Sequence, residues 1–211
     1  MDDTPMNTAL LSTTYFGPVQ WYQKLYRYDQ VLIEQHETFQ KQTFRNRCLI
    51  ATTQGIQVLT VPVSTGDSHA IKDVRVSDHG NWRHLHWQAL QSAYGDSPFF
   101  EYYADDLWPF FEKRWDFLLD FNEAIRQKMC ELLDIHPQVG YTSDYQHIDS
   151  QHSTLNDFRT AIDPKHPVAD ADFIPRRYYQ VFEQKHGFLP NLSILDLLFN
   201  MGPESIYYLQ S

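Results

Sequence analysis

Two β-rich runs joined by a tight turn constrain the fold of this 211-residue chain more than any other feature. The runs cover residues 43–51 and 56–63, and Gln54-Gly55 between them supplies a glycine that tolerates a positive φ angle. The pattern predicts a β-hairpin at about residues 43–63. Because side chains alternate along a strand, one face of the first strand would hold Phe44, Asn46, Cys48 and Ile50, and the other Arg45, Arg47 and Leu49.

Around this hairpin, strand-like runs give way to longer helical ones. Further strands are predicted at 9–12, 30–34 and 71–77, and helices at 19–28, 81–94, 107–134 and 193–201. Residues 142–187 are polar and broken by prolines, which indicates a long loop with one candidate strand at 178–182. The fold class is therefore α/β or α+β. We expect a single domain over residues 1–211 with a mixed sheet that includes the hairpin, and a helical segment at about 81–134.

The composition excludes several classes of partner. With 17 basic and 27 acidic residues, the chain is not expected to bind nucleic acid or an anionic membrane surface. No apolar run has the length of a membrane-spanning helix, and the first residues lack the plan of a signal peptide, so a cytoplasmic protein is expected. The two cysteines form no zinc or disulfide pattern, and Cys48 is predicted to be a buried free thiol. No metal, no cofactor and no particular oligomeric state is predicted.

A cluster of cations stands out in this acidic chain. Lys41, Arg45 and Arg47 fall within seven positions, in a stretch that otherwise has strand character. Arginine side chains bind phosphate or carboxylate in a bidentate fork, so the cluster fits an anionic ligand. The alternative is an exposed strand face whose cations pair with Glu34 or Glu37. Asn46 would lie on the apolar face, where its amide either pins a loop or contacts a ligand.

A second group of candidate residues lies in the predicted helix 81–94. His86 falls on its apolar stripe, where a neutral imidazole could act as a general base or, alternatively, be a hydrogen-bonded core residue. Arg83, four residues before Trp87, either stacks on that ring or joins the anion site. His84 and His86 are two apart and face different ways, which makes them a poor metal pair.

The third pattern is at the start of the last helix. Ser193 and Asp196 are three residues apart, which is typical of an N-cap serine followed by an acid in the first turn. The same helix start could instead hold an anion if it faced a cleft.

These residues, taken in order, resemble the WbqC-like family, which is often associated with O-antigen and other surface-polysaccharide gene clusters. The resemblance rests on Thr14-Tyr15-Phe16, Tyr22, Leu25, Lys41, Asn46, Arg47, Leu59-Thr60-Val61-Pro62, Trp82, Arg83, His86, Tyr94, Pro98-Phe99, Phe188, Pro190, Leu192-Ser193-Ile194, Asp196, Asn200 and Gly202. It covers most of the chain and implies a setting in surface-polysaccharide or amino-sugar biosynthesis.

The chain departs from the family pattern in three places. Ser12 and Thr13 stand where members typically carry Gln-Pro, and Gln35-His36 stands where many carry an Asp-Asp pair. The section before the last motif also lacks a Gly-rich stretch that longer members have. If those features serve catalysis, the site of this chain is altered.

The leading hypothesis is a cytoplasmic transferase that moves an acyl or aminoacyl group on a phosphorylated or nucleotide-activated sugar. In this hypothesis the anionic part of the substrate is held by Lys41, Arg45, Arg47 and Arg83. Asn46 orients the substrate, His86 accepts the proton, and Tyr15 and Trp82 offer stacking surfaces. The alternative is a non-catalytic ligand-binding or scaffold protein of the same pathway. Nucleotidyl transfer ranks lowest because the sequence has no phosphate-binding loop.

Overall fold

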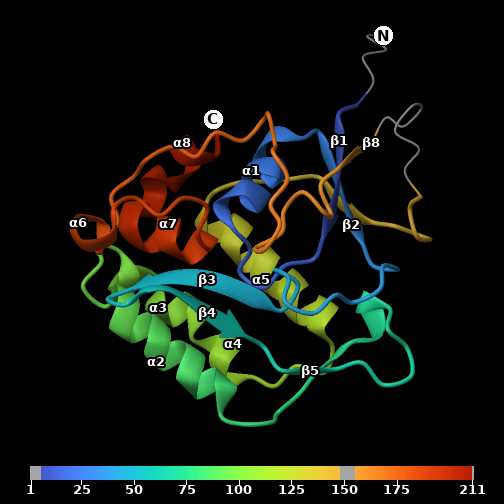
Figure 1. The fold of residues 1–211 in the computed structure, drawn as a ribbon, viewed down its shortest axis with the longest axis horizontal. Helices are drawn as coiled ribbons and strands as arrows, with labels where there is room; N and C mark the ends of the chain where they lie inside the picture. The colour runs from blue at the N-terminus through green and yellow to red at the C-terminus, as the bar shows by residue number, and fades with distance from the viewer. Residues whose placement is uncertain (1–5, 148–154, 211) are drawn as a thin grey trace.

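A parallel sheet of four strands forms one side of the molecule, and an antiparallel hairpin lies near the middle of the molecule (Figure 1). The computed structural model describes residues 6–147 and 155–210. Its strands are β1 (Thr8–Ser12), β2 (Gln30–Glu34), β3 (Arg47–Thr52), β4 (Gly55–Thr60), β5 (Val63–Ser64), β6 (Arg75–Val76), β7 (Val139–Tyr141) and β8 (Leu155–Asp157). Its helices are α1 (Val19–Arg27), α2 (Trp82–Tyr94), α3 (Phe100–Leu107), α4 (Pro109–Glu112), α5 (Leu118–Leu132), α6 (Glu183–His186), α7 (Ile194–Met201) and α8 (Ile206–Leu209), with 3-10 turns at Ile71–Asp73 and Gly202–Ser205.

The four-stranded sheet has the order β7-β2-β1-β8, and each neighbouring pair is parallel. All five residues of β1 are buried, as expected for a central strand covered on both faces. β1, α1 and β2 form a β-α-β unit, because parallel neighbours need a crossover connection. This arrangement brings the carboxyl ends of the strands to the same edge of the sheet.

The predicted hairpin is confirmed, and it forms a two-stranded sheet of its own, β3–β4. Gly55 has a φ of 107°, the conformation for which glycine was expected in the turn. The first strand begins at Arg47, however, and residues 43–46 form a turn ahead of it. The expectation that Arg45 and Arg47 share a strand face was therefore wrong, because strand alternation does not extend back to Arg45.

Helices account for most of the predicted segment 81–134, and the α/β class is confirmed. α2 matches its prediction closely, whereas α3, α4 and α5 divide the rest of the segment into three. Two smaller predictions were wrong. Residues 71–77 form a 3-10 turn followed by the two-residue β6, and 178–182 contain no strand. Figure 1 shows α2, α3 and α4 on one side of the hairpin and α6, α7 and α8 on the other.

The start of α7 ties several segments together. Ser193 is its N-cap, as predicted, and accepts a hydrogen bond from the amide of Leu195 at 3.3 Å. Asp196 has a different role from the expected one, because its carboxylate accepts hydrogen bonds from side chains: Tyr94 at 2.9 Å, Tyr178 at 2.6 Å and Gln180 at 2.9 Å. Burial raises the pKa of Asp196 to about 6, although these three donors act to lower it.

Candidate functional site

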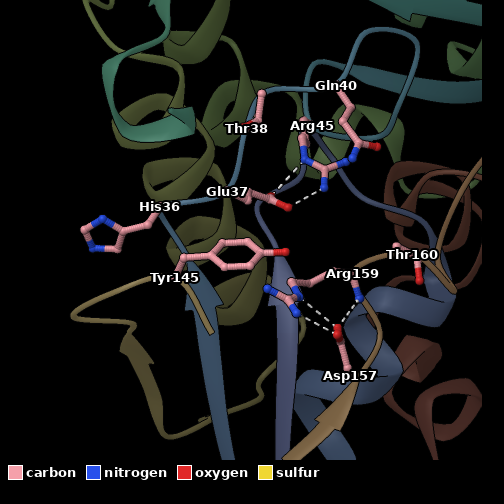
Figure 2. Close-up of a pocket in the computed structure, with 9 residues that line it drawn as sticks. All are labelled: His36, Glu37, Thr38, Gln40, Arg45, Tyr145, Asp157, Arg159 and Thr160. Atoms are coloured by element: carbon pink, nitrogen blue, oxygen red, sulfur yellow. Dashed lines mark hydrogen bonds and ion pairs between the residues drawn. The ribbon is translucent and has the colours of Figure 1, made fainter. Parts of the chain in front are cut away.

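Polar side chains line a pocket at the edge of the sheet where the parallel strands end. β1 and β2 end in register at Ser12 and Glu34, and β8 ends at Asp157. Ligands of open parallel sheets bind beyond the carboxyl ends of the strands. The pocket, called the edge pocket below, has a volume of about 500 Å³ (Figure 2). Its lining residues are His36, Glu37, Thr38, Gln40, Arg45, Tyr145, Asp157, Arg159 and Thr160.

Arg45 lies on one wall of the edge pocket and is held there by Glu37. Its Nε and Nη2 donate to the two carboxylate oxygens of Glu37 at 2.8 and 2.5 Å, and Nη2 also donates to Ser12 Oγ at 2.8 Å. Only 5% of the Arg45 side chain and 7% of the Glu37 side chain are exposed. A bidentate pair of this kind holds the guanidinium in one plane. Nη1 is then the one Arg45 guanidinium nitrogen without a hydrogen-bond partner among the described residues.

Arg159, from the chain just after β8, is engaged through all of its guanidinium nitrogens. Nε and Nη2 donate to Asp157 at 2.9 and 2.7 Å, and Nη1 donates to Glu34 at 3.2 Å. The guanidinium also lies over the ring of Tyr145, 5.0 Å from its centroid. Glu34 is fully buried and accepts a further hydrogen bond from the hydroxyl of Thr142. This network holds both arginines in place before any ligand arrives.

The other lining groups are neutral and accessible. Thr38, Gln40 and Thr160 are exposed, as is 43% of Tyr145. Their hydroxyl and amide groups can both donate and accept hydrogen bonds. In Figure 2 the ring of His36 points away from the other labelled side chains. The edge pocket therefore presents several hydroxyl-like partners around two fixed guanidinium groups, an arrangement that suits a polyhydroxylated ligand.

The predicted cation cluster is divided by the structure. Arg45 lines the edge pocket, whereas Lys41 is exposed and Arg47 begins β3, and neither belongs to the pocket lining. The proposed pairing of the cluster with Glu37 is present, but it is buried rather than on an exposed face. Asn46 is buried and pins a loop, because its Nδ2 donates to the carbonyl of Val61 at 2.8 Å.

Tyr15, Trp82 and His86 are brought together, but in the core rather than at a pocket surface. The hydroxyl of Tyr15 lies 2.9 Å from Nδ1 of His86, and the rings of Trp82 and His86 are 5.1 Å apart. Tyr15 is fully buried, and only 5% of Trp82 is exposed. Burial lowers the pKa of His86 to about 4, against an opposing hydrogen bond to the backbone of Thr60. This geometry fits the hydrogen-bonded core histidine that the sequence left as an alternative.

Arg83 stacks over Trp82, with its guanidinium 4.6 Å from the ring centroid. The prediction had considered Trp87 as the stacking ring. Nη1 of Arg83 pairs with Asp78 at 2.6 Å, while Nε and Nη2 are buried without a partner among the described residues. The catalytic role of His86 stays a prediction, and so do the substrate-binding roles of Lys41, Arg45, Asn46, Arg47, Arg83, Tyr15 and Trp82.

Sequence reasoning missed Tyr145, Asp157 and Arg159. All three lie in the stretch 142–187 that was interpreted as a long loop. A signal was present, because Asp157 and Arg159 are opposite charges two residues apart, on either side of the apolar Phe158. Such a short strand has too few residues for a periodic pattern to be recognised.

A comparison with profiles of known protein families shows to which family the chain belongs. A profile of the WbqC-like protein family matches residues 13–169, about three quarters of the chain. The chain belongs to the WbqC-like family. The matched WbqC-like region extends from the residue after β1 to the chain beyond Arg159, and so it includes the whole lining of the edge pocket.

A relative from Mycobacterium tuberculosis has a similar length. The uncharacterized protein Rv1507c of Mycobacterium tuberculosis (strain ATCC 25618 / H37Rv) is 28% identical in an alignment of 225 residues, gaps included, and this alignment covers 96% of each chain. No solved structure matches this WbqC-like chain. In the parts of the chain that the structure describes, no helix is both long and apolar enough to cross a membrane. Within those same parts, no three His, Cys, Asp or Glu side chains are grouped as metal ligands would be.

Proposed function

We propose that this WbqC-like protein is a cytoplasmic enzyme of surface-polysaccharide or amino-sugar biosynthesis, and that its edge pocket binds the sugar. The substrate is a phosphorylated or nucleotide-activated sugar, and the reaction transfers an acyl or aminoacyl group. The biosynthetic setting rests on the family resemblance. The proposal of a sugar as the ligand is supported by one structural observation: the guanidinium groups of Arg45 and Arg159 are held in place among neutral hydroxyl and amide groups.

Different side chains of the edge pocket contact different parts of the ligand. Nη1 of Arg45 is the donor for one anionic oxygen of the ligand. Thr38, Gln40 and Thr160 exchange hydrogen bonds with sugar hydroxyls, because each side chain can donate and accept. Asp157 has 26% of its side chain exposed, more than Glu37 or Glu34, so it is the carboxylate that a ligand hydroxyl or amine reaches first.

A non-catalytic ligand-binding or scaffold role is the second candidate. The observation that favours it is the position of His86, the predicted base, in an aromatic core with its pKa lowered to about 4. A histidine in this position is neutral at pH 7 but is not among the residues that line the edge pocket. Binding without turnover would follow if no other group supplies the base.

Ligand titration tests the proposed site. Gln40→Ala removes an exposed amide from the pocket lining and should weaken sugar binding by about fivefold, the effect of one lost hydrogen bond. Gln54→Ala makes the same change on the hairpin turn and should leave the affinity unchanged. The probes are hexose 1-phosphates and uridine diphosphate sugars, measured by calorimetry.

Two results would contradict the proposal: no saturable binding of any sugar probe, or equal effects of the two substitutions. Mass spectrometry of the sugar after incubation with acyl donors then separates the two candidates. An enzyme changes the mass of the sugar, whereas a scaffold protein leaves it as it was.

A further inference from the structure

The charges around the edge pocket are dominated by carboxylates. Glu34, Glu37 and Asp157 surround only two guanidinium groups, those of Arg45 and Arg159. Each guanidinium is already neutralised by at least one carboxylate within hydrogen-bond distance. Within the lining itself Glu37 and Asp157 balance the two arginines, and the buried Glu34 behind Arg159 adds a further carboxylate, so no excess positive charge is left for a strongly anionic ligand.

Few donors remain for an anion in this pocket. Arg159 has all three nitrogens engaged with Asp157 and Glu34, and its plane lies over Tyr145. Arg45 uses Nε and Nη2 for Glu37, which leaves Nη1. Nη1 of Arg45 is the one guanidinium nitrogen of the lining without a partner among the described residues, and its two N–H groups suit a single anionic group.

No other source of positive charge belongs to the described lining. Diphosphate groups are usually held by a helix N-terminus, a glycine-rich loop or several cations, and the nine lining residues include no glycine, no helix start and no lysine or arginine beyond the two paired arginines. Lys41 follows Gln40 in the sequence but is not a lining residue. Nζ of Lys72 lies 3.4 Å from Nδ1 of His36. Residues 148–154, outside the described part, contain no lysine or arginine.

We infer that the edge pocket selects a sugar with at most one anionic group, such as a sugar monophosphate, over a nucleoside diphosphate sugar. This inference rests on the proposed function and narrows its substrate class. A second phosphate would have to lie near Glu37 or Asp157 with no free cation to offset the repulsion. A single phosphate can sit at Nη1 of Arg45 while the sugar hydroxyls contact the neutral side chains.

Matched ligand pairs test this selection. The probes are glucose, galactose and N-acetylglucosamine, each offered as the 1-phosphate and as the uridine diphosphate sugar, titrated calorimetrically into the full chain. At least one 1-phosphate should bind about tenfold more tightly than its nucleotide partner.

A gain-of-charge variant provides the second arm. Thr160→Lys adds a cation at an exposed position of the lining and should reduce the preference for the 1-phosphate by at least about threefold. Thr53→Lys makes the same change at an exposed position of the hairpin turn and should leave the preference unchanged. Both positions are exposed, so both variants should fold.

The possible results separate the two proposals. Nucleotide sugars that bind as tightly as the 1-phosphates, or more tightly, overturn the inference and leave the proposed function standing. A preference that Thr53→Lys changes as much as Thr160→Lys also overturns it. No binding of any sugar overturns both.

Discussion

At the scale of single residues, the carboxylates of this chain fall into two physical classes. Glu37 and Asp157 are each paired bidentately with an arginine. Asp196 is more deeply buried than either of them and pairs with no cation among the described residues; it is held by two tyrosine hydroxyls and one amide. Neutral donors compensate only part of the desolvation cost, so the pKa of Asp196 stays above its ordinary value.

This difference predicts the pH dependence of stability at Asp196. Its pKa is about 6 in the folded chain against an ordinary 3.8, so the folded state binds the proton more tightly than the unfolded state. The contribution is fully present below pH 4 and is lost as the pH rises through about 6, by about 3 kcal/mol in the free energy of unfolding. Urea unfolding of the wild type and Asp196→Asn at several pH values measures it.

The substitution should cost less stability at pH 7 than at pH 4, because Asn cannot gain or lose the proton. Any cost from the altered hydrogen bonds to Tyr94, Tyr178 and Gln180 is present at every pH and cancels in this comparison. Parallel stability curves for the two proteins across pH 4–7 would contradict the raised pKa.

Single residues also show what the sequence could and could not predict of the site. Arg45 and its partner Glu37 were both recognised, because charge type and closeness in sequence suffice to suggest a pair. Their burial was not predicted, since it depends on the turn at 43–46 and on β1 beside it. Ser12, which completes the pair, was noticed only as a departure from the family pattern.

At the scale of elements, the end of α7 depends on one glycine. Gly202 has a φ of 54° and a ψ of −128°, a region that side chains strongly disfavour. A Cβ atom there would lie 2.6 Å from Cδ1 of Phe99, so Gly202 also permits close packing of α7 on the residues that precede α3. Both the backbone and the ring would have to shift to admit any larger residue.

We therefore expect Gly202→Ala to lower the free energy of unfolding by about 3 kcal/mol. Gly80→Ala is the matched control, because Gly80 also has a positive φ, 71°, but open space around its missing Cβ. That substitution should cost about 1 kcal/mol, from backbone strain alone. Urea denaturation gives both values, and equal losses would show that contact with Phe99 adds nothing.

The elements themselves were predictable to different degrees. β2 and α2 were recovered almost to the residue, because each has a strong periodic pattern and a clear boundary. β8 has three residues and was missed, although it brings Asp157 to the sheet edge. Its place beside β1 comes from parallel pairing with residues about 147 positions earlier, a contact that no local pattern reports.

At the scale of the whole molecule, the segment that contains Asp170 and Asp172 is bound to the first helix, α1. Lys24 of α1 is fully buried, 2.6 Å from a carboxylate oxygen of Asp170 and 4.5 Å from the ring centroid of Phe158. Gln20 also donates to Asp170 at 2.9 Å, and Arg27 donates to the carbonyl of Asp172 at 2.8 Å. The edge pocket is assembled in the same way, from residues that are more than a hundred positions apart.

The Lys24–Asp170 pair predicts an asymmetric response to mutation. Asp170→Ala leaves the Lys24 ammonium buried without a counter-charge and should cost about 3 kcal/mol at pH 7. Lys24→Met replaces the cation by an apolar chain of similar length beside Phe158 and should cost about 1 kcal/mol or less. Asp172→Ala is the control in the same segment, because its contacts to α1 use the backbone carbonyl.

The pH dependence of the same pair has the opposite sign to that of Asp196. Burial acts to raise the pKa of Asp170, but Lys24 and Gln20 outweigh it and hold the pKa below its ordinary value of 3.8. Its contribution to stability is therefore present above that value and is lost as the pH falls through the lowered pKa of the folded state. Urea unfolding should show the cost of Asp170→Ala shrinking in strong acid. If Lys24→Met is as destabilising as Asp170→Ala at pH 7, the buried ammonium is not what makes this attachment sensitive.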